Sequence, residues 1–312
     1  MKAVVYSKKG FPDKLICCEV ERPLPNDNEV LIRIDAVSAN AADYRSMKLG
    51  IIPKRKIFGA DIAGRVELAG SNIQGFKPGD EVVGELADYG FGGFAEYVVA
   101  PETALVLKPS GLSFEGAAAM PMASTTAIQA LRDKGNIQKG QKVLIMGSGG
   151  GVGTFAVQLT KYFGAEVTAV CSTSNVEQTK LLGADYVIDY TKEDFTKLTG
   201  HFDLILAING NHSLLSYKQL LAANGVFVMV GGALLQIFRS ILFGWLMSLG
   251  SKKMLFLAAK SNQKDLEFTL KLAGEGKINP VIDRLYPLDR TAEALRYLSK
   301  GHAHGKVVIL VK

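Results

Sequence analysis

The chain has 312 residues, of which 48% are hydrophobic and 21% charged, and its formal net charge is +6. This length exceeds one ordinary hydrophobic core and favours two domains. No basic run interleaved with aromatic residues accompanies the positive charge, which argues against a specific nucleic-acid partner. The three cysteines form no even framework for disulfides, and residues 1–10 lack the apolar core of a signal peptide, so we expect a cytoplasmic protein.

The first hundred residues have the pattern of a β domain. Short runs rich in Val, Ile and Tyr occupy residues 3–6, 29–37, 64–68, 81–84 and 95–100. Turn residues separate them, for example Lys77-Pro78-Gly79-Asp80. Many short strands at this spacing predict a barrel-like β domain.

The pattern changes near Ser113, which precedes a predicted helix over residues 116–131. Strand-like runs then follow at residues 143–146, 166–170, 186–188, 203–208 and 226–230, with a sixth at 254–258. Helix-like stretches lie between them at residues 151–162, 175–182 and 213–221. Alternating helices and nearly continuous apolar strands predict a parallel sheet covered on both faces.

Two further helices and a strand are predicted in the tail. The helices span residues 262–275 and 290–299, and the second has Asp289 as its predicted N-cap and Gly301 past its end. The last strand, residues 307–311, resembles the N-terminal β region. We therefore expect a discontinuous first domain, residues 1–115 with 262–312, and a second domain over residues 116–261.

The segment over residues 232–250 is apolar and long enough to span a bilayer, but it carries Arg239 near its middle. We expect no transmembrane helix here. The apolar residues 234–249 are instead expected to wall a substrate cleft or to form a dimer contact, and weak contact with a membrane surface is a further option.

A glycine-rich loop follows the strand at residues 143–146. Its spacing is Gly147-x-x-Gly150-x-x-Gly153, and a helix-like stretch comes next. Glycines let the backbone approach a pyrophosphate, and the helix N-terminus offers unpaired N–H groups to it. The predicted cofactor-binding residues here are Gly147, Ser148, Gly149, Gly150, Gly151, Val152 and Gly153.

The next strand ends in Cys171-Ser172-Thr173-Ser174-Asn175. NAD enzymes usually place a carboxylate there to bind the ribose 2′-hydroxyl, and this loop has none. Its hydroxyls and amide suit a 2′-phosphate, so Ser172 and Asn175 are predicted to bind the cofactor. The sequence thus favours NADP(H) over NAD(H).

The whole chain resembles the zinc-independent medium-chain dehydrogenase/reductases, specifically their quinone oxidoreductase and enone reductase group. Besides the glycine loop, the residues that carry the resemblance are 40–43 (NAAD), 59–66 (GADIAGRV), 76–82 (FKPGDEV), 93–97 (GFAEY), 126–127 (TA) and 305–308 (GKVV). The resemblance implies an α/β protein with a GroES-like β-barrel domain, a Rossmann doubly wound parallel-sheet domain and a homodimeric assembly.

Zinc-using relatives keep Cys and His ligands in two of these motifs, and this chain does not. The His position is Ala60, and the segment that usually carries the first Cys ligand is residues 38–43, SANAAD. The short stretch 84–93 replaces the four-cysteine lobe. We therefore expect no metal.

The resemblance also implies site residues. Asn40, Asp43 and Tyr44 match a motif near the nicotinamide and are the predicted catalytic residues, although Asp43 also suits a helix cap and Tyr44 a packing role. Thr126 and Lys306 are predicted to bind the cofactor, with a core threonine and a structural lysine as alternatives. Asn209 at the sheet edge and Tyr190 at the adenosine end complete the set.

Without zinc, a conjugated acceptor is the easiest to reduce, because the negative charge spreads onto its oxygen as hydride arrives and a few hydrogen-bond donors can stabilise it. We therefore predict hydride transfer from NADPH to a small apolar quinone or α,β-unsaturated carbonyl. A zinc-free alcohol dehydrogenase, an enoyl-thioester reductase and a low-activity NADPH-binding scaffold remain as alternatives.

Overall fold

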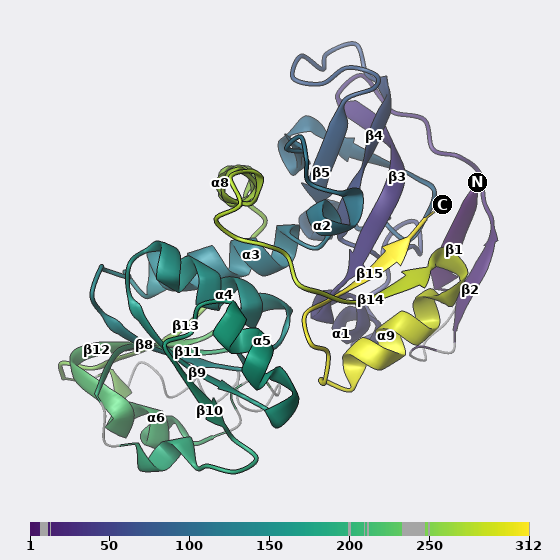
Figure 1. Ribbon diagram of the computed structural model, residues 1–312. Helices are drawn as coiled ribbons and strands as arrows, with labels where there is room; N and C mark the ends of the chain where they lie inside the picture. Colours follow the sequence, from purple (N-terminus) through teal and green to yellow (C-terminus); the bar gives the residue numbers. More distant parts are fainter. Residues whose placement is uncertain are drawn as a thin grey trace. The chain divides into compact units, whose positions relative to one another are not determined.

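The computed structural model describes residues 1–6, 12, 14–198, 201–208, 210, 212–232, 247–248 and 250–311 (Figure 1). The chain divides into two compact units, which we call unit 1 (Met1–Thr125 with Lys260–Lys312) and unit 2 (Thr126–Ala259). The predicted site residue Asn209 and most of the apolar segment 232–250 lie outside the described residues. No helix in the described ranges is both long and apolar enough to cross a membrane.

Unit 1 is built on a sheet of mostly antiparallel strands in the order β14-β15-β3-β4-β5-β7, with β6 also paired to β3. Its strands are β3 (Glu29–Ala39), β4 (Asp61–Ala69), β5 (Glu81–Glu85), β6 (Tyr97–Pro101), β7 (Leu105–Leu107), β14 (Ile282–Pro287) and β15 (Lys306–Leu310). A separate antiparallel pair consists of β1 (Lys2–Tyr6) and β2 (Leu15–Glu19). Since β15 pairs with β3, the last strand of the chain belongs to the sheet of the first hundred residues.

The helices of unit 1 are α1 (Ala41–Lys48), α2 (Phe114–Ala118), α8 (Gln263–Gly274) and α9 (Thr291–Ser299). The short 3₁₀ turns η1 (Ala87–Tyr89), η2 (Glu102–Ala104) and η6 (Leu288–Arg290) connect other elements. The prediction of Asp289 as the N-cap of the last helix was wrong, because η6 includes Asp289 and the N-cap is Arg290.

Unit 2 contains a six-stranded sheet in the order β10-β9-β8-β11-β12-β13, with every neighbouring pair parallel. The strands are β8 (Lys142–Met146), β9 (Glu166–Cys171), β10 (Tyr186–Asp189), β11 (Phe202–Ala207), β12 (Leu221–Met229) and β13 (Lys253–Phe256). The chain starts at the centre with β8, runs out through β9 and β10, and returns to continue through β11. This is the Rossmann order, so the predicted fold is confirmed.

The helices α4 (Gly151–Tyr162) and α5 (Val176–Leu181) pack against β8, β9 and β10, and α6 (Leu214–Leu220) packs against β12 (Figure 1). The short turns η4 (Thr173–Asn175) and η5 (Phe195–Lys197) follow β9 and β10 respectively.

The single helix predicted over residues 116–131 was wrong. The structure has α2, then α3 (Pro121–Ile128), then a π-helical turn η3 (Gln129–Lys134). Proline lacks a backbone N–H and disfavours the helical conformation of the residue before it, so Pro121 ends one helix and begins another. The boundary between the two units falls inside α3.

Candidate active site

A row of polar residues crosses the sheet of unit 1. Ser38 on β3 pairs in register with Asp61 on β4, and Asp61 pairs with Glu85 on β5. Partners in register project from the same face of a sheet, so the three side chains are neighbours. Their residues are 0%, 0% and 6% exposed, respectively. The strand register therefore buries a row of polar side chains in the interior of unit 1.

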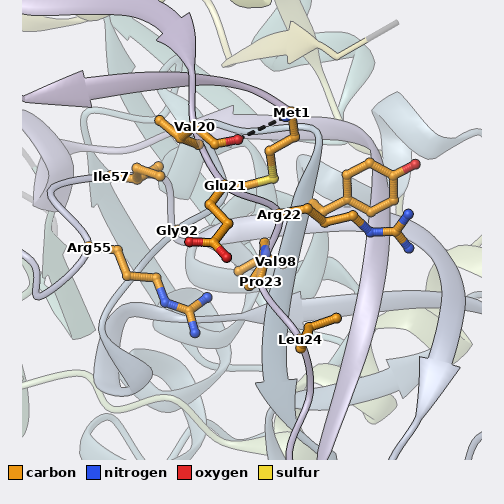
Figure 2. A pocket seen from close by; sticks show the side chains of 11 residues that line it. Met1, Val20, Glu21, Arg22, Pro23, Leu24, Arg55, Ile57, Gly92 and Val98 are labelled. Carbon is orange, nitrogen blue, oxygen red and sulfur yellow. Dashed lines mark hydrogen bonds between the residues drawn. The ribbon is translucent and has the colours of Figure 1, made fainter.

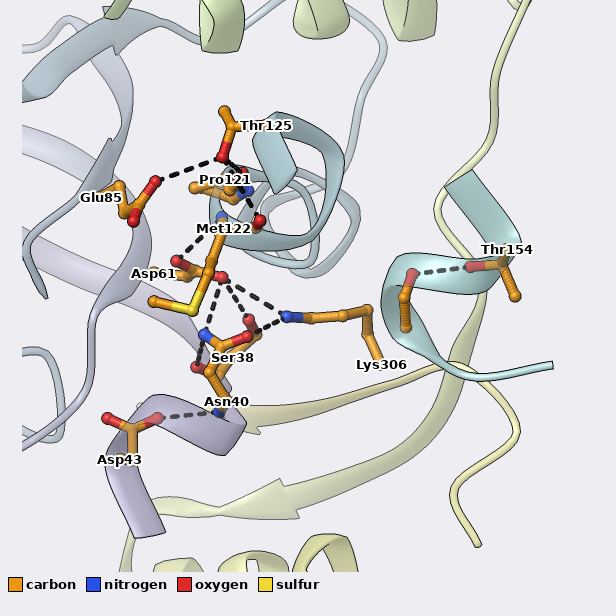
Figure 3. Close-up of polar contacts among 11 residues, drawn as sticks. Ser38, Asn40, Asp43, Asp61, Glu85, Pro121, Met122, Thr125, Thr154 and Lys306 are labelled. Carbon is orange, nitrogen blue, oxygen red and sulfur yellow. Dashed lines mark hydrogen bonds and ion pairs between the residues drawn. The ribbon is translucent and has the colours of Figure 1, made fainter. Parts of the chain in front are cut away.

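The carboxylate of Asp61 is the centre of this row (Figure 3). Its Oδ2 accepts hydrogen bonds from Asn40 Nδ2 at 2.8 Å and from Ser38 Oγ at 3.1 Å, and the ammonium of Lys306 lies 3.4 Å away. The backbone N–H of Met122 donates to its Oδ1 at 3.2 Å. Burial raises the pKa of Asp61, whereas the charge of Lys306 and the hydrogen bond from Asn40 lower it.

The predicted residues Asn40 and Lys306 are direct partners. Lys306 Nζ donates to Asn40 Oδ1 at 2.6 Å, and Asn40 Nδ2 donates both to Asp61 and to the carbonyl oxygen of Ser38, the latter at 3.3 Å. Both amide hydrogens and the amide oxygen of Asn40 are thus engaged. Asn40 therefore orients the ammonium of Lys306 and the carboxylate of Asp61. Lys306 itself is 4% exposed.

The predicted residue Asp43 is buried at the start of α1. Its Oδ2 accepts the backbone N–H of Asn40 at 2.8 Å, and its Oδ1 accepts that of Gly59 at 2.9 Å. A Cβ at Gly59, where φ is +93°, would lie 2.6 Å from the backbone nitrogen of Phe94, so only glycine fits. Burial raises the pKa of Asp43 to about 7, against the lowering effect of these two N–H groups. Asp43 therefore holds the backbone of Asn40 in place.

Tyr44, the third predicted catalytic residue, is half-buried, and the ammonium of Lys48 lies 5.3 Å from its ring centre. Thr126 is buried in α3. The residue before it belongs to the buried row, because the Thr125 hydroxyl donates to Pro121 O at 2.8 Å and lies 3.4 Å from Glu85 Oε2.

The glycine loop of unit 2 is tightly folded between β8 and α4. Gly147 has φ +80°, and a Cβ at Gly153 would lie 2.1 Å from the carbonyl oxygen of Gly147. A Cβ at Gly149 would lie 2.4 Å from Asn175 Cγ, whereas one at Gly150 would be 3.8 Å from its nearest neighbour. Gly147 and Gly153 therefore shape the turn, and Gly150 leaves its space open for a ligand.

Three predicted side chains near this loop form hydrogen bonds within unit 2. Ser148 is fully buried, and its hydroxyl donates to Val170 O at 3.3 Å. Asn175 Nδ2 donates to Ser172 Oγ at 3.1 Å, and Ser172 Oγ also lies 3.1 Å from Ser174 Oγ. Ser172 and Asn175, predicted together, are therefore direct neighbours in the loop after β9.

A carboxylate that the sequence argument missed stands beside this loop. Asp189 at the end of β10 pairs in register with Cys171 at the end of β9. Its carboxylate accepts hydrogen bonds from the Thr173 hydroxyl at 2.6 Å and the Thr191 hydroxyl at 2.7 Å, and Lys192 Nζ lies 3.5 Å away. The bond from Thr173, with those from Thr191, lowers the pKa of Asp189 to about 2. Tyr190 follows and is 53% exposed.

A surface hollow of about 510 Å³ is a separate feature of unit 1 (Figure 2). Its charged lining residues are Glu21, Arg22 and Arg55, and Tyr97 and several aliphatic side chains line the rest. None of its lining residues belongs to the buried row or was predicted as a site residue. The hollow and the buried row are therefore distinct.

Comparison with known proteins shows to which family the chain belongs. Residues 26–110 match a family described as "Alcohol dehydrogenase GroES-like domain", and residues 182–309 match one described as "Zinc-binding dehydrogenase". The chain is 35% identical over 324 residues to the 2-methylene-furan-3-one reductase of Solanum lycopersicum, covering 99% of this chain and 79% of the relative. The chain belongs to the medium-chain dehydrogenase/reductase family.

Other members of the medium-chain dehydrogenase/reductase family are similar over nearly the same length. The chain is 31% identical to the chloroplastic NADPH-dependent alkenal/one oxidoreductase of Arabidopsis thaliana, covering 99% of this chain and 79% of that one. The solved quinone oxidoreductase of Coxiella burnetii superposes with a TM-score of 0.90 at 29% identity, covering 100% and 99%. A solved NAD-dependent alcohol dehydrogenase gives 0.88 at 30%, covering 100% of both. The chain is therefore a nicotinamide-dinucleotide-dependent oxidoreductase of the quinone oxidoreductase and enone reductase group.

Two observations distinguish this chain from the zinc-binding members of the family. Ala60, at the histidine position, is fully buried. In the part of the chain that the structure describes, no group of three or more His, Cys, Asp and Glu side chains is arranged to hold a metal ion.

Sequence reasoning missed Asp61, Glu85 and Asp189 as site residues. The first two carried a signal, because each is a single acid inside an apolar strand-like run, GADIAG and VVGELA. A buried charge needs a partner, and that requirement singles such residues out. No comparable signal marked Asp189, whose role depends on the register of β9 and β10.

Proposed function

We propose that this chain reduces small apolar quinones or α,β-unsaturated carbonyls with NADPH, without zinc. The observation that carries the proposal is the buried ammonium of Lys306, held by Asn40 and Asp61. Two relatives support the acceptor class, since they are named a 2-methylene-furan-3-one reductase and a quinone oxidoreductase.

The nicotinamide cofactor would supply the hydride. As hydride reaches a conjugated acceptor, negative charge develops on its oxygen and must be stabilised by donors already in place. A lysine ammonium has three N–H donors, and the contacts among the described residues occupy two of them. We propose that the third N–H of Lys306 donates to the acceptor oxygen. Asn40 and Asp61 hold the ammonium in place, and Asp43 holds Asn40 through its backbone N–H.

For the cofactor, we propose that the glycine loop from Gly147 to Gly153 receives the pyrophosphate, and that Ser172 and Asn175 bind a 2′-phosphate. The loop Cys171–Asn175 contains no carboxylate, which supports NADP(H). Asp189 does not oppose this, because its two oxygens already accept hydrogen bonds from Thr173 and Thr191, and one of them faces Lys192. Tyr190 would contact the adenosine end, and Thr126, Tyr44 and Asn209 complete the proposed set.

We further propose that the enzyme is a cytoplasmic homodimer. Light scattering coupled to size exclusion measures the assembly state, and a monomeric mass at micromolar concentration contradicts this part of the proposal.

The deciding experiment measures oxidation of NADPH and of NADH against a quinone, an enone and a simple ketone. We expect turnover of the first two acceptors, little with the ketone, and a preference for NADPH. Equal use of NADH overturns the cofactor assignment, and loss of activity with a chelator overturns the zinc-free mechanism. Binding of NADPH without turnover of any acceptor points to a scaffold instead of an enzyme.

A further inference from the structure

Two buried carboxyl groups face each other across β4 and β5. Asp61 and Glu85 are register partners on these antiparallel strands, and their residues are 0% and 6% exposed. Register partners have Cβ atoms roughly 5 Å apart, and like charges at that separation repel. Two ionised carboxylates are therefore disfavoured here, and the arrangement favours a proton on one of the pair.

The donors around the two groups are unequal. Asp61 accepts hydrogen bonds from Asn40, Ser38 and the Met122 N–H, and faces the Lys306 ammonium. Among the described residues, Glu85 has one side-chain contact of this kind, the Thr125 hydroxyl at 3.4 Å. That hydroxyl has one hydrogen, and Pro121 O is nearer to it at 2.8 Å. The negative charge is therefore stabilised on Asp61 and not on Glu85.

The charged groups around Glu85 favour the same assignment. β4 contributes Asp61, β15 contributes Lys306 and the turn η1 contributes Asp88, whereas β7 has no titratable side chain and α2 carries only Glu115. Lys306, which is 4% exposed, supplies the cation of the buried row. Burial, followed by the charges of Asp61 and Asp88, raises the pKa of Glu85 to about 8.

We propose that Asp61 and Glu85 hold a single proton between them, resident on Glu85, and that this proton keeps the Lys306 ammonium directed at Asn40 and the acceptor. The inference rests on the proposed function, because it assigns Glu85 as a positioning residue for Lys306. When Glu85 ionises, two carboxylates face one ammonium. The added attraction draws Lys306 into the pair and away from the acceptor oxygen. Activity therefore depends on the protonation of Glu85, although this proton is not transferred to the substrate.

The proton itself is observable without any turnover. Infrared spectra of the protein in heavy water distinguish the carbonyl band of a protonated carboxylic acid from the bands of carboxylates. We expect such a band at pH 7 that fades as pH rises through about 8, and a wild-type minus Glu85→Gln difference spectrum that assigns it. Asp43→Asn identifies any band that belongs to Asp43 instead. Absence of a band assigned to Glu85 at pH 7 overturns the proposal.

The second measurement is the pH profile of kcat. In the wild type we expect kcat to fall about tenfold per pH unit above the pKa of Glu85. Glu85→Gln, which mimics the protonated acid, removes that fall. Asp88→Asn, outside the buried row, moves it to lower pH because the charge of Asp88 helps to raise the pKa of Glu85. Glu115→Gln is the matched control and leaves the profile where it was.

An alkaline fall that persists unchanged in Glu85→Gln overturns the role of the pair. If the wild type reduces no quinone or enone, the proposed function fails, and the infrared band still reports whether Glu85 holds the proton.

Discussion

The carboxylate of Asp189 accepts a 2.6 Å hydrogen bond from the hydroxyl of Thr173, which joins the end of β10 to the loop after β9. Lys192 Nζ lies 3.5 Å from the same carboxylate oxygen, and its side chain is 68% exposed. The loop after β9 lacks any cation of its own, and Lys192 is linked to it through Asp189 and Thr173.

The position of Lys192 leads to a prediction about cofactor selectivity. The 3.5 Å distance is long for an ion pair and the Lys192 side chain is 68% exposed, so the ammonium is available to a phosphate. We expect Lys192→Ala to weaken NADPH binding about tenfold, the worth of one hydrogen bond to a charged group, and to leave NADH binding unchanged. Titration with 2′,5′-ADP and with 5′-AMP isolates the 2′-phosphate.

Lys180→Ala is the matched control for that titration, since Lys180 is exposed on α5 and pairs with Glu177 at 3.0 Å. Equal losses in the two variants indicate a general charge effect. A loss in Lys180→Ala alone shows that Lys180, and not Lys192, binds the 2′-phosphate, which contradicts the prediction.

Substitutions of Lys306 and Asp61 distinguish the contribution of the Lys306 ammonium to stability from its contribution to activity. Lys306→Met leaves Asp61 as a buried charge without a cation, and we expect it to lower the free energy of unfolding by about 3–5 kcal/mol. Adding Asp61→Asn removes that charge and restores most of the stability, which denaturant unfolding measures. Activity stays low in the double variant because no ammonium faces the acceptor. A stable double variant with wild-type kcat contradicts the proposed role of Lys306.

Two glycines of the cofactor loop are expected to respond differently to alanine. A Cβ at Gly153 meets the Gly147 carbonyl oxygen at 2.1 Å, so Gly153→Ala destabilises unit 2. The nearest atom to a Cβ at Gly150 is 3.8 Å away, and its φ is −87°, so Gly150→Ala leaves thermal stability unchanged. If the pyrophosphate approaches Gly150, its variant nevertheless binds NADPH more weakly. Thermal melts with and without cofactor test the predictions on stability and on binding. If Gly150→Ala binds NADPH as tightly as the wild type, the pyrophosphate does not lie against Gly150.

The raised pKa of Glu85 predicts an unusual pH dependence of stability. Its pKa rises from 4.5 to about 8 on folding, so between these values the folded state keeps a proton that the unfolded chain releases. The contribution of Glu85 to the free energy of unfolding must therefore fall as pH rises through this window. Urea titrations from pH 5 to pH 9 on the wild type and Glu85→Gln measure the difference. Parallel curves for the two proteins mean that Glu85 titrates normally.

The sequence predicted what depends on local periodicity. The alternation of apolar strands and helices after Ser113 led to the parallel sheet, and the spacing Gly147-x-x-Gly150-x-x-Gly153 to the loop between β8 and α4. The edge strand β2 was missed because four of its five residues are exposed, so no buried face marks it. β14 was missed for a similar reason, since none of its six residues is buried.

The candidate site was only partly predictable because its contacts depend on register between distant strands. Asn40 and Lys306 were both predicted, but their bond joins residues 266 positions apart. Nothing local indicated that Asp61 would oppose Glu85, or that Asp189 would reach Thr173. A one-residue slip of β4 would have turned Asp61 to the other face of the sheet.

The final strand, β15, lies between β14 and β3 in the sheet of unit 1, and it delivers Lys306. Unit 2 is one uninterrupted stretch and is complete when residue 259 has been synthesised. Unit 1 begins first but cannot finish until the last strand has left the ribosome. Asn40 is therefore synthesised 266 residues before the lysine that bonds to it, and a chain truncated before β15 lacks both an interior strand and the ammonium that balances Asp61.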